Sequence, residues 1–316
     1  MNIADSQMLY YVNNKLKLPR GDRKKYLAQV DNLIDRFGKK ATEDPEIGII
    51  KFHKTGSLRK GTVLRPRGSH GVDADIAVYV DEENTAPTVL ENLHQKIRKL
   101  LIKTYPGKKE SDFTIQPRTL GIVFTDSGLE VDLVPIIPVA GPGDFGWQPS
   151  SRGEAFILTS VPGQLEFIRE RKEQYPYFTA LVRLIKHWRN YKELDDSLRS
   201  FTIELIVCYL QEQRGNPATL IDGLLRFFLY VAQSELREQI SFNGKPKRFR
   251  DRVAIVDPVN PENNVARRLT DTDCETIMGA AIETWELLSA AQTESLKGRA
   301  LDYCRQAFGP TFAIED

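Results

Sequence analysis

The most constraining feature of this chain is the segment KTGSLRKGTVLRPRGSHGVDADIAVYV, in which Gly56-Ser57 precedes an Asp-x-Asp pair, Asp73 and Asp75. Successive side chains of a strand point to opposite faces, so the two aspartates project together while the apolar residues around them face a core. Two adjacent carboxylates repel one another unless a cation lies between them. An isolated Asp-x-Asp is equally compatible with solvated side chains at the start of a strand, so the rest of the segment must decide.

A third acidic position follows in the predicted strand LEVDLV. Glu130 and Asp132 lie two residues apart on one face of this strand. Asp132 lies deeper in the apolar run, whereas Glu130 lies near a predicted hairpin turn at 126–128. If this strand is the neighbour of the Asp-x-Asp strand, Asp132 completes a site of three carboxylates.

The chemistry that needs these residue types is the joining of nucleotides. A hydroxyl attacks an α-phosphate in line, and two magnesium ions held by carboxylates activate the attacking oxygen and neutralise the leaving pyrophosphate. A Gly-Ser turn at the start of a helix supplies N–H groups and a hydroxyl to the β- and γ-phosphates. Gly56 allows the backbone to approach closely. Arg59 and Lys60 either add positive charge or are solvated.

Hydrophobic patterning predicts an α+β chain. A mixed sheet with flanking helices occupies residues 1–155, including N-terminal helices at 3–17 and 22–38, and a mostly helical lobe occupies 156–316. A loop rich in Gly and Pro at 139–154 marks the change. The predicted strands are 48–53, 113–117, 120–125 and 129–137 around the Asp-x-Asp strand, with a short strand at 253–256. The other predicted helices are 87–103, 162–172, 177–191, 200–212, 217–234, 271–288 and 295–307.

Two residues of the helical lobe are candidates for binding an anion. Lys186 lies in the apolar helix LVRLIKHW, where a buried lysine is costly unless it meets an anion, although a lysine that extends its ammonium into water is an equal alternative. Ser200 opens the helix SFTIELIVCYL and is predicted as its N-cap, a position at which phosphate also binds.

Composition excludes several classes of protein. The formal net charge of +1 gives no general attraction for nucleic acid, although basic clusters occur at Lys108-Lys109 and at 245–252. The three cysteines match no zinc spacing and suit a reducing compartment. No apolar stretch approaches the ~20 residues that span a bilayer, and the first residues lack the apolar core of a signal peptide. We therefore expect a cytoplasmic protein without a membrane partner.

These motifs carry a family resemblance. GSLRKGT, VDADIAVYV and LEVDLVPII resemble the core of the polymerase-β-type nucleotidyltransferases. The continuation through LVRLIKHW, SFTIEL and DPVNPENNVA is similar to the bacterial cGAS/DncV-like nucleotidyltransferases (CD-NTases), relatives of the animal cyclic GMP-AMP and oligoadenylate synthetases. The similarity covers nearly the whole chain and is strongest to clade C, the group found beside HORMA-domain partners in anti-phage (CBASS) operons.

The resemblance implies a polymerase-β-like core packed against a helical lobe. It implies two Mg²⁺ ions, with Mn²⁺ as a substitute, held by Asp73, Asp75 and Asp132, and it makes Asp132 the general base. It implies triphosphate contacts from Gly56, Ser57, Lys186 and Ser200. The implied product is a cyclic di- or trinucleotide second messenger containing adenine, made from ATP and other ribonucleoside triphosphates, with a HORMA-domain protein as activator. Residues 257–264 are implied to pack near the nucleotide pocket.

Three other hypotheses remain open on the sequence. Two of them have the same nucleotidyltransferase core: a linear 2′-5′ oligoadenylate synthase and an RNA-tailing transferase. The net charge supports neither RNA tailing nor activation by nucleic acid. The third is a non-catalytic nucleotide sensor, against which the three retained acids argue. One departure from the family pattern is a longer stretch at 65–72, which predicts a flexible loop at the rim of the site.

Overall fold

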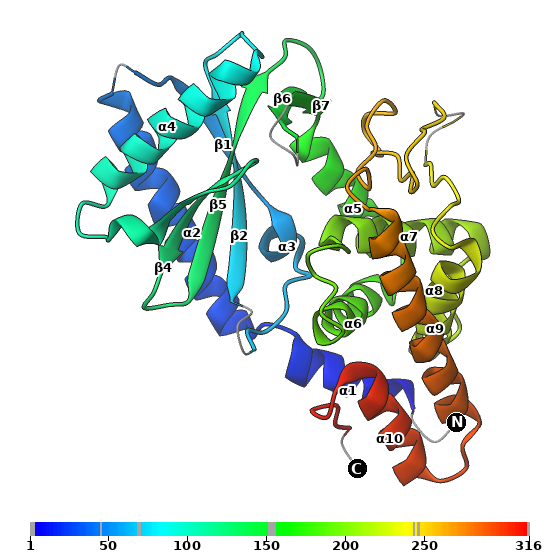
Figure 1. Cartoon of the computed structure of the whole chain (residues 1–316). Coiled ribbons are helices and arrows are strands. Elements are labelled where there is room, and N and C mark those ends of the chain that lie inside the picture. Colours follow the sequence, from blue (N-terminus) through cyan, green and yellow to red (C-terminus); the bar gives the residue numbers. More distant parts are fainter. Residues whose placement is uncertain are drawn as a thin grey trace. The chain divides into compact units, whose positions relative to one another are not determined.

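The computed structural model describes residues 4–44, 46–67, 71–150, 156–242, 244 and 247–314. They form two compact units (Figure 1). The first unit is Leu18–Glu166, and the second combines Met1–Lys17 with Phe167–Asp316. The predicted rim loop includes 68–70, and the predicted domain boundary, between 155 and 156, adjoins 151–155, whereas the observed division follows Glu166. Both of these stretches lie outside the described residues.

A mixed sheet organises the first unit. Its central order is β1-β2-β5-β4-β3, and β6 and β7 extend it from β5. The β2–β5 pair is parallel, whereas the other strand pairs among the described residues are antiparallel. The strands are β1 (Ile49–Thr55), β2 (Val72–Val80), β3 (Phe113–Ile115), β4 (Leu120–Phe124), β5 (Leu129–Pro138), β6 (Gly146–Pro149) and β7 (Phe156–Thr159).

Two long helices cover the apolar face of this sheet: α2 (Arg20–Thr42) and α4 (Pro87–Thr104). Val30, Leu33 and Phe37 form a buried stripe on α2 and share one core with the inward residues of β2 and β5. Because side chains alternate along a strand, the acidic residues of β2 and β5 project from the opposite face. The short helix α3 (Gly56–Lys60) follows β1 directly, as the sequence predicted.

The second unit is helical. Its core is built around aromatic side chains: Trp188 lies 4.8 Å from Phe228, and Phe228 lies 5.4 Å from Phe227, measured between ring centroids. The indole N–H of Trp188 donates to Thr284 Oγ1 at 2.7 Å, so the buried ring leaves no polar atom unpaired. The helices are α1 (Asp5–Tyr11) with a π turn at Val12–Leu16, α6 (Phe178–Tyr191), α7 (Ser200–Arg214), α8 (Leu220–Ser234), α9 (Asp271–Thr293) and α10 (Lys297–Phe308); α5 (Val161–Gln174) spans the division between the units.

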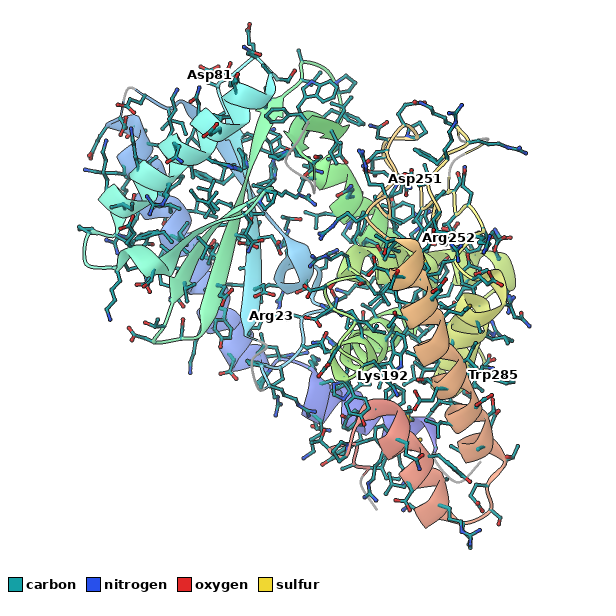
Figure 2. The ribbon with its side chains drawn as sticks, viewed as in Figure 1. Arg23, Asp81, Lys192, Asp251, Arg252 and Trp285 are labelled. Atoms are coloured by element: carbon teal, nitrogen blue, oxygen red, sulfur yellow. The ribbon has the colours of Figure 1, made fainter. Side chains whose placement is uncertain are left out.

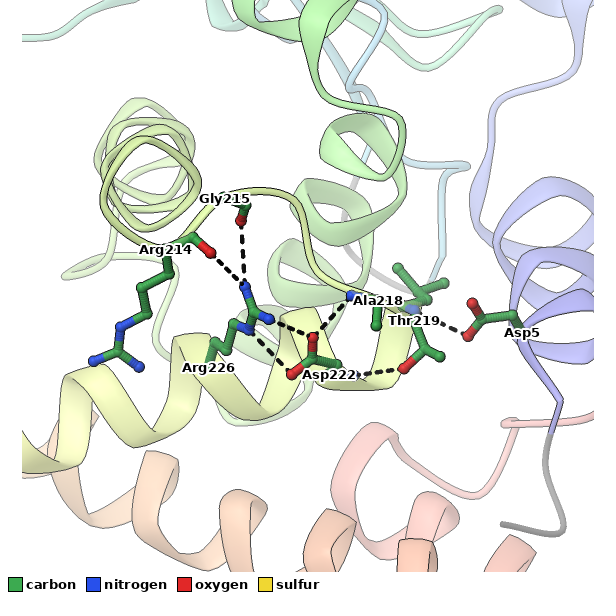
Figure 3. A network of polar contacts seen from close by, with 8 residues as sticks. Asp5, Arg214, Gly215, Ala218, Thr219, Asp222 and Arg226 are labelled. Atoms are coloured by element: carbon green, nitrogen blue, oxygen red, sulfur yellow. Dashed lines mark hydrogen bonds and ion pairs between the residues drawn. The ribbon is translucent and has the colours of Figure 1, made fainter.

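This division differs from the predicted one at its N-terminal end, because α1 belongs to the helical unit. Tyr11 is buried, and its hydroxyl is hydrogen-bonded to His187 Nε2 at 3.0 Å. Asp5 accepts hydrogen bonds from the Tyr177 hydroxyl and from the backbone N–H of Leu220, both at 2.9 Å. Asp5 is labelled in Figure 3. The apolar face of an N-terminal helix predicts burial but does not specify which partner buries it.

A polar network closes the turn between α7 and α8 (Figure 3). Arg226 forms an ion pair with Asp222 at 2.8 Å and donates to the carbonyl oxygens of Arg214 and Gly215. The Thr219 hydroxyl accepts from the backbone N–H of Asp222 and caps α8. Carbonyls that α7 leaves unpaired at its C-terminal end are therefore satisfied by one arginine.

The segment at 253–266 forms isolated bridges rather than the predicted short strand: Ile240 pairs with Ile255, and Val256 pairs with Asn264. Asn264 is buried and uses its whole amide. It accepts from the N–H groups of Ile255 and Ala266, and it donates to Val253 O at 2.7 Å and to Asp251 Oδ2 at 3.0 Å (Asp251 is labelled in Figure 2). This asparagine holds together a region that has few ladder hydrogen bonds.

In the part of the chain that the structure describes, no helix has the length and apolar character needed to cross a membrane.

Candidate active site

The three predicted aspartates lie on two adjacent parallel strands. Asp75 in β2 is the register partner of Asp132 in β5, and Asp73 is the partner of Glu130. Side chains that lie opposite one another in register share a face, so all four carboxylates project from the face of the sheet opposite the α2/α4 core. The pairing meets the condition on which the sequence hypothesis depended, that the Asp132 strand is the neighbour of the Asp-x-Asp strand.

Electrostatics supports this proximity. Burial, together with the negative charges of Asp75 and then Asp73, raises the pKa of Asp132 to about 6, while the Thr119 hydroxyl acts in the opposite direction. Glu130 makes a smaller contribution of the same sign as the aspartates. A carboxylate that is both partly desolvated and surrounded by like charge is the environment that a bound cation relieves.

The residues fit a divalent metal through the chemistry of the donor set. Mg²⁺ prefers carboxylate oxygens and completes its coordination with water and phosphate oxygens. Among the described residues, however, no three Asp, Glu, His or Cys side chains are arranged closely enough to hold an ion by themselves. The acidic face therefore offers neighbouring oxygen ligands rather than a closed protein cage, as expected for a metal that also binds a nucleotide.

Gly56 lies directly against this acidic face. Its φ of +67° favours glycine, and a Cβ built on it would lie 1.6 Å from Asp75 Oδ2 and 2.6 Å from Asp75 Cγ. The preceding residue, Thr55, is the register partner of Asp75. The sequence hypothesis required glycine for close approach to a phosphate; the structure adds that the Asp75 carboxylate occupies the space beside it.

Helix α3 is short and is held from both sides. Leu58 is buried in the core of the first unit, and the guanidinium of Arg23 in α2 donates to its carbonyl oxygen at 3.0 Å (Arg23 is labelled in Figure 2). The Ser57 carbonyl accepts from the backbone N–H groups of Thr62 and Val63, which closes the turn at Gly61. Ser57 thus lies in a fixed first turn, next to the glycine that contacts Asp75.

Residues of β3 and β4, which the sequence analysis did not predict, lie beside Asp132 on the neighbouring strands. Gly121 is the register partner of Asp132, and Thr114 is the partner of Gly121. A Cβ at Gly121 would lie 2.2 Å from Thr114 Oγ1 and 3.3 Å from Asp132 Oδ1, so only glycine leaves room for both side chains. The available signal was a glycine inside an apolar strand, which marks close approach of another group.

The second unit contains both candidate anion-binding residues, Lys186 in α6 and Ser200 at the start of α7. Lys186 is only 5% exposed, so it does not extend into water. Arg189, one turn further along α6, donates to Ser200 Oγ and to Leu198 O, each at 3.2 Å. Helix α7 begins at Ser200, its N-cap is Arg199, and no side chain caps it. The prediction of Ser200 as the N-cap was therefore one residue off, because its hydroxyl accepts from Arg189 instead.

The fold and the acidic face define the class of protein: a polymerase-β-type nucleotidyltransferase core followed by a helical unit. A CBASS oligonucleotide cyclase CdnC of Escherichia coli (strain KTE188) is 37% identical over 318 residues, covering 100% of this chain and 99% of the relative. The cyclic AMP-AMP-AMP synthase of E. coli (strain MS 115-1) is 32% identical over 311 residues, covering 96% of this chain and 95% of the relative. No family model matches the chain. The chain belongs to the CBASS oligonucleotide cyclases.

Solved structures support this family assignment. E. coli MS115-1 CdnC with ATP has a TM-score of 0.87 and 30% identity, covering 99% of this chain and 100% of the other. The CdnC:HORMA-deltaN complex from the same source gives a TM-score of 0.84 and 29% identity, covering 99% of both chains. The predicted fold class, the resemblance to the cGAS/DncV-like enzymes and the enzyme class are confirmed: the protein is a nucleotidyltransferase that makes cyclic oligonucleotides.

Proposed function

We propose that this enzyme joins ATP, alone or with a second ribonucleoside triphosphate, into a cyclic di- or trinucleotide, with Asp73, Asp75 and Asp132 as the ligands of two divalent metal ions. The observation that carries the metal site is the register of Asp75 with Asp132, together with the raised pKa of Asp132. Adenine as a substrate base is supported by a relative named a cyclic AMP-AMP-AMP synthase and by a similar structure that contains ATP.

In this proposal each residue has a physical role. Bound divalent metal supplies neutralisation of phosphate charge and activation of the attacking hydroxyl. Asp132, which lies in register with Asp75 on the acidic face, is the proposed general base that accepts the proton of that hydroxyl. Gly56 and Ser57 bind the triphosphate through the first turn of α3, and Lys186 and Ser200 bind it from the helical unit.

A HORMA-domain protein is the activator that we propose. The support is the similar structure in which CdnC is bound to HORMA-deltaN. The formal net charge of +1 provides no general attraction for a nucleic-acid activator. Addition of a HORMA-domain protein is therefore expected to raise the rate of product formation, whereas addition of duplex DNA alone is not.

Product analysis tests the proposed function. The purified protein is incubated with the four ribonucleoside triphosphates and magnesium, with and without the HORMA-domain partner, and phosphatase-treated products are examined by mass spectrometry. A phosphatase-resistant product containing two or three nucleotide units, at least one of them adenine, is expected. Only linear, phosphatase-sensitive products, or cyclic products without adenine, would contradict the proposal. Asp75→Asn serves as the control that must lack the product.

A further inference from the structure

One row of residues crosses the sheet of the first unit through the acidic face. Strand pairing aligns Thr55 with Asp75, Asp75 with Asp132, Asp132 with Gly121, and Gly121 with Thr114. Residues that lie opposite one another in register share a face, so all five positions belong to the face that carries the acids. The two ends of the row differ in chemistry. At one end the chain enters the Gly-Ser turn, and at the other a threonine hydroxyl lies on β3, the last strand in the sheet order.

Gly121 carries no side chain, and the side chains on either side of it in the row approach its bare backbone. A Cβ on Gly121 would lie 2.2 Å from Thr114 Oγ1 and 3.3 Å from Asp132 Oδ1. The two oxygens are therefore at most about 5.5 Å apart, since their separation cannot exceed these two distances together. Thr114 is exposed, unlike most residues of the row. Because an O–H···O hydrogen bond spans about 2.7–2.8 Å, each of these oxygens can reach a hydroxyl group placed above the glycine.

The side of the acids on which Gly121 lies decides which part of a substrate it suits. In-line transfer places the attacking oxygen and the leaving pyrophosphate on opposite sides of the α-phosphorus. Gly56 lies against Asp75 on the β1 side of the acids, whereas Gly121 lies against Asp132 on the β4 side. Pyrophosphate bound at Gly56 therefore leaves towards β1, and the attacking hydroxyl approaches from the side of Gly121.

We propose that Thr114 and the bare backbone of Gly121 form a subsite for the ribose of the acceptor nucleotide, an assignment that rests on the proposed function. The attacking hydroxyl donates to Asp132, and Thr114 Oγ1 donates to the neighbouring hydroxyl of the same ribose. In the joining step the attacking oxygen bonds to the α-phosphorus, the bond from that phosphorus to the pyrophosphate oxygen breaks, and the hydroxyl proton passes to Asp132. Thr114 takes no part in the proton transfer; it fixes which of the two ribose hydroxyls meets the base.

This subsite selects for a ribonucleotide acceptor. A site that hydrogen-bonds a substrate hydroxyl discriminates against the analogue that lacks it. A side chain at position 121 would occupy the place of the ribose hydroxyls, which accounts for a glycine within an apolar strand. Threonine at position 114 also suits a strand because it is β-branched, and valine shares that property. Thr114→Val therefore removes the hydroxyl while it keeps the shape and strand preference of the residue.

Separate donor and acceptor nucleotides test the subsite. 2′,3′-Dideoxy-ATP has no ribose hydroxyl and can only donate, whereas α,β-methylene-ATP has no cleavable bond between its α- and β-phosphorus and can only accept. With magnesium, the HORMA-domain protein and saturating donor, Thr114→Val should raise the acceptor KM about three- to tenfold, as expected for one lost hydrogen bond, and leave the donor KM unchanged. Thr114→Ser, which keeps the hydroxyl, should retain the acceptor KM of the unmodified protein. Thr125→Val is the matched control, on an exposed threonine directly after β4.

Removal of a hydroxyl from the acceptor provides a second readout that does not depend on protein stability. The monodeoxy form of α,β-methylene-ATP that still reacts lacks the hydroxyl that Thr114 contacts. With the unmodified protein it should lose the same factor in acceptor KM as Thr114→Val does. With Thr114→Val it should lose nothing further, because the variant and the analogue remove the same hydrogen bond.

Two results would overturn the subsite while dinucleotide is still formed. One is an acceptor KM that Thr114→Val leaves unchanged. The other is a deoxy acceptor whose loss adds in full to that of Thr114→Val, which would show that the two hydroxyls do not meet. Absence of any dinucleotide from the unmodified protein would instead contradict the proposed function, and the subsite would fall with it.

Discussion

Gly56→Ala is the substitution that most sharply separates backbone strain from damage to the acidic face. Alanine at φ +67° costs about 1–2 kcal/mol, since the left-handed region is unfavourable for any residue with a Cβ. The added carbon would lie 1.6 Å from Asp75 Oδ2, so the carboxylate must move by well over 1 Å to reach ordinary contact. A displacement of about 1 Å at a reacting centre costs roughly 100-fold in rate.

Gly128→Ala is the matched control. Gly128 also has a φ of +67°, but a Cβ on it would meet nothing within 4 Å. The unfavourable backbone conformation should lower the free energy of unfolding of both variants by about 1–2 kcal/mol. Crowding against Asp75 should lower that of Gly56→Ala further. In a steady-state assay with ATP and magnesium, Gly56→Ala should lose about 100-fold or more in kcat while Gly128→Ala retains most of its activity. Equal kcat values for the two variants would refute the argument that Asp75 requires the glycine.

Three further predictions concern individual side chains. Because folding raises the pKa of Asp132 from 3.8 to about 6, metal-free protein should gain stability from this group as the pH falls from 7 towards 4. Asp132→Asn should therefore stabilise it at pH 7 by about 1–3 kcal/mol in denaturant unfolding with EDTA, and a loss of stability would contradict the electrostatic argument. Lys186→Ala should weaken ATP binding at least tenfold with a small change in melting temperature. Lys192→Ala, which removes an ion pair with Glu283, should leave ATP affinity unchanged. A large loss of melting temperature with unchanged ATP affinity in Lys186→Ala would make Lys186 structural. Asn264→Ala removes four hydrogen bonds and should destabilise the protein by about 2–4 kcal/mol without changing ATP affinity in calorimetry, so a specific loss of affinity would link this segment to the nucleotide site.

Local patterns predicted the elements of this fold well. Hydrophobic patterning predicted the helix at 22–38 that corresponds to α2, and alternation in VDADIAVYV assigned both aspartates to one face of β2. Observed boundaries of the other helices and the longer strands fall within a few residues of the predicted ones. These features depend on residues near one another in the chain, so the sequence contains them directly.

Long-range features were less predictable. Strand β6 falls within the predicted loop rich in Gly and Pro, and β7 lies just after it; pairing of β6 with β5 and of β7 with β6, rather than alternation, defines these strands. The partner of α1 and the closeness of Gly121 to Asp132 depend on residues distant in sequence. The approach of the Thr114 hydroxyl to Gly121 is likewise visible only once β3 and β4 are paired.

Crystallography with manganese and a non-hydrolysable ATP analogue tests the central claim most directly, because the anomalous signal of manganese locates each ion independently of catalysis. Two manganese ions between the carboxylates of Asp73, Asp75 and Asp132, each also bound to phosphate oxygens of the analogue, are the predicted result. Manganese bound elsewhere, or nucleotide bound without any contact between metal and Asp132, would contradict the assignment of the acidic face as the catalytic centre.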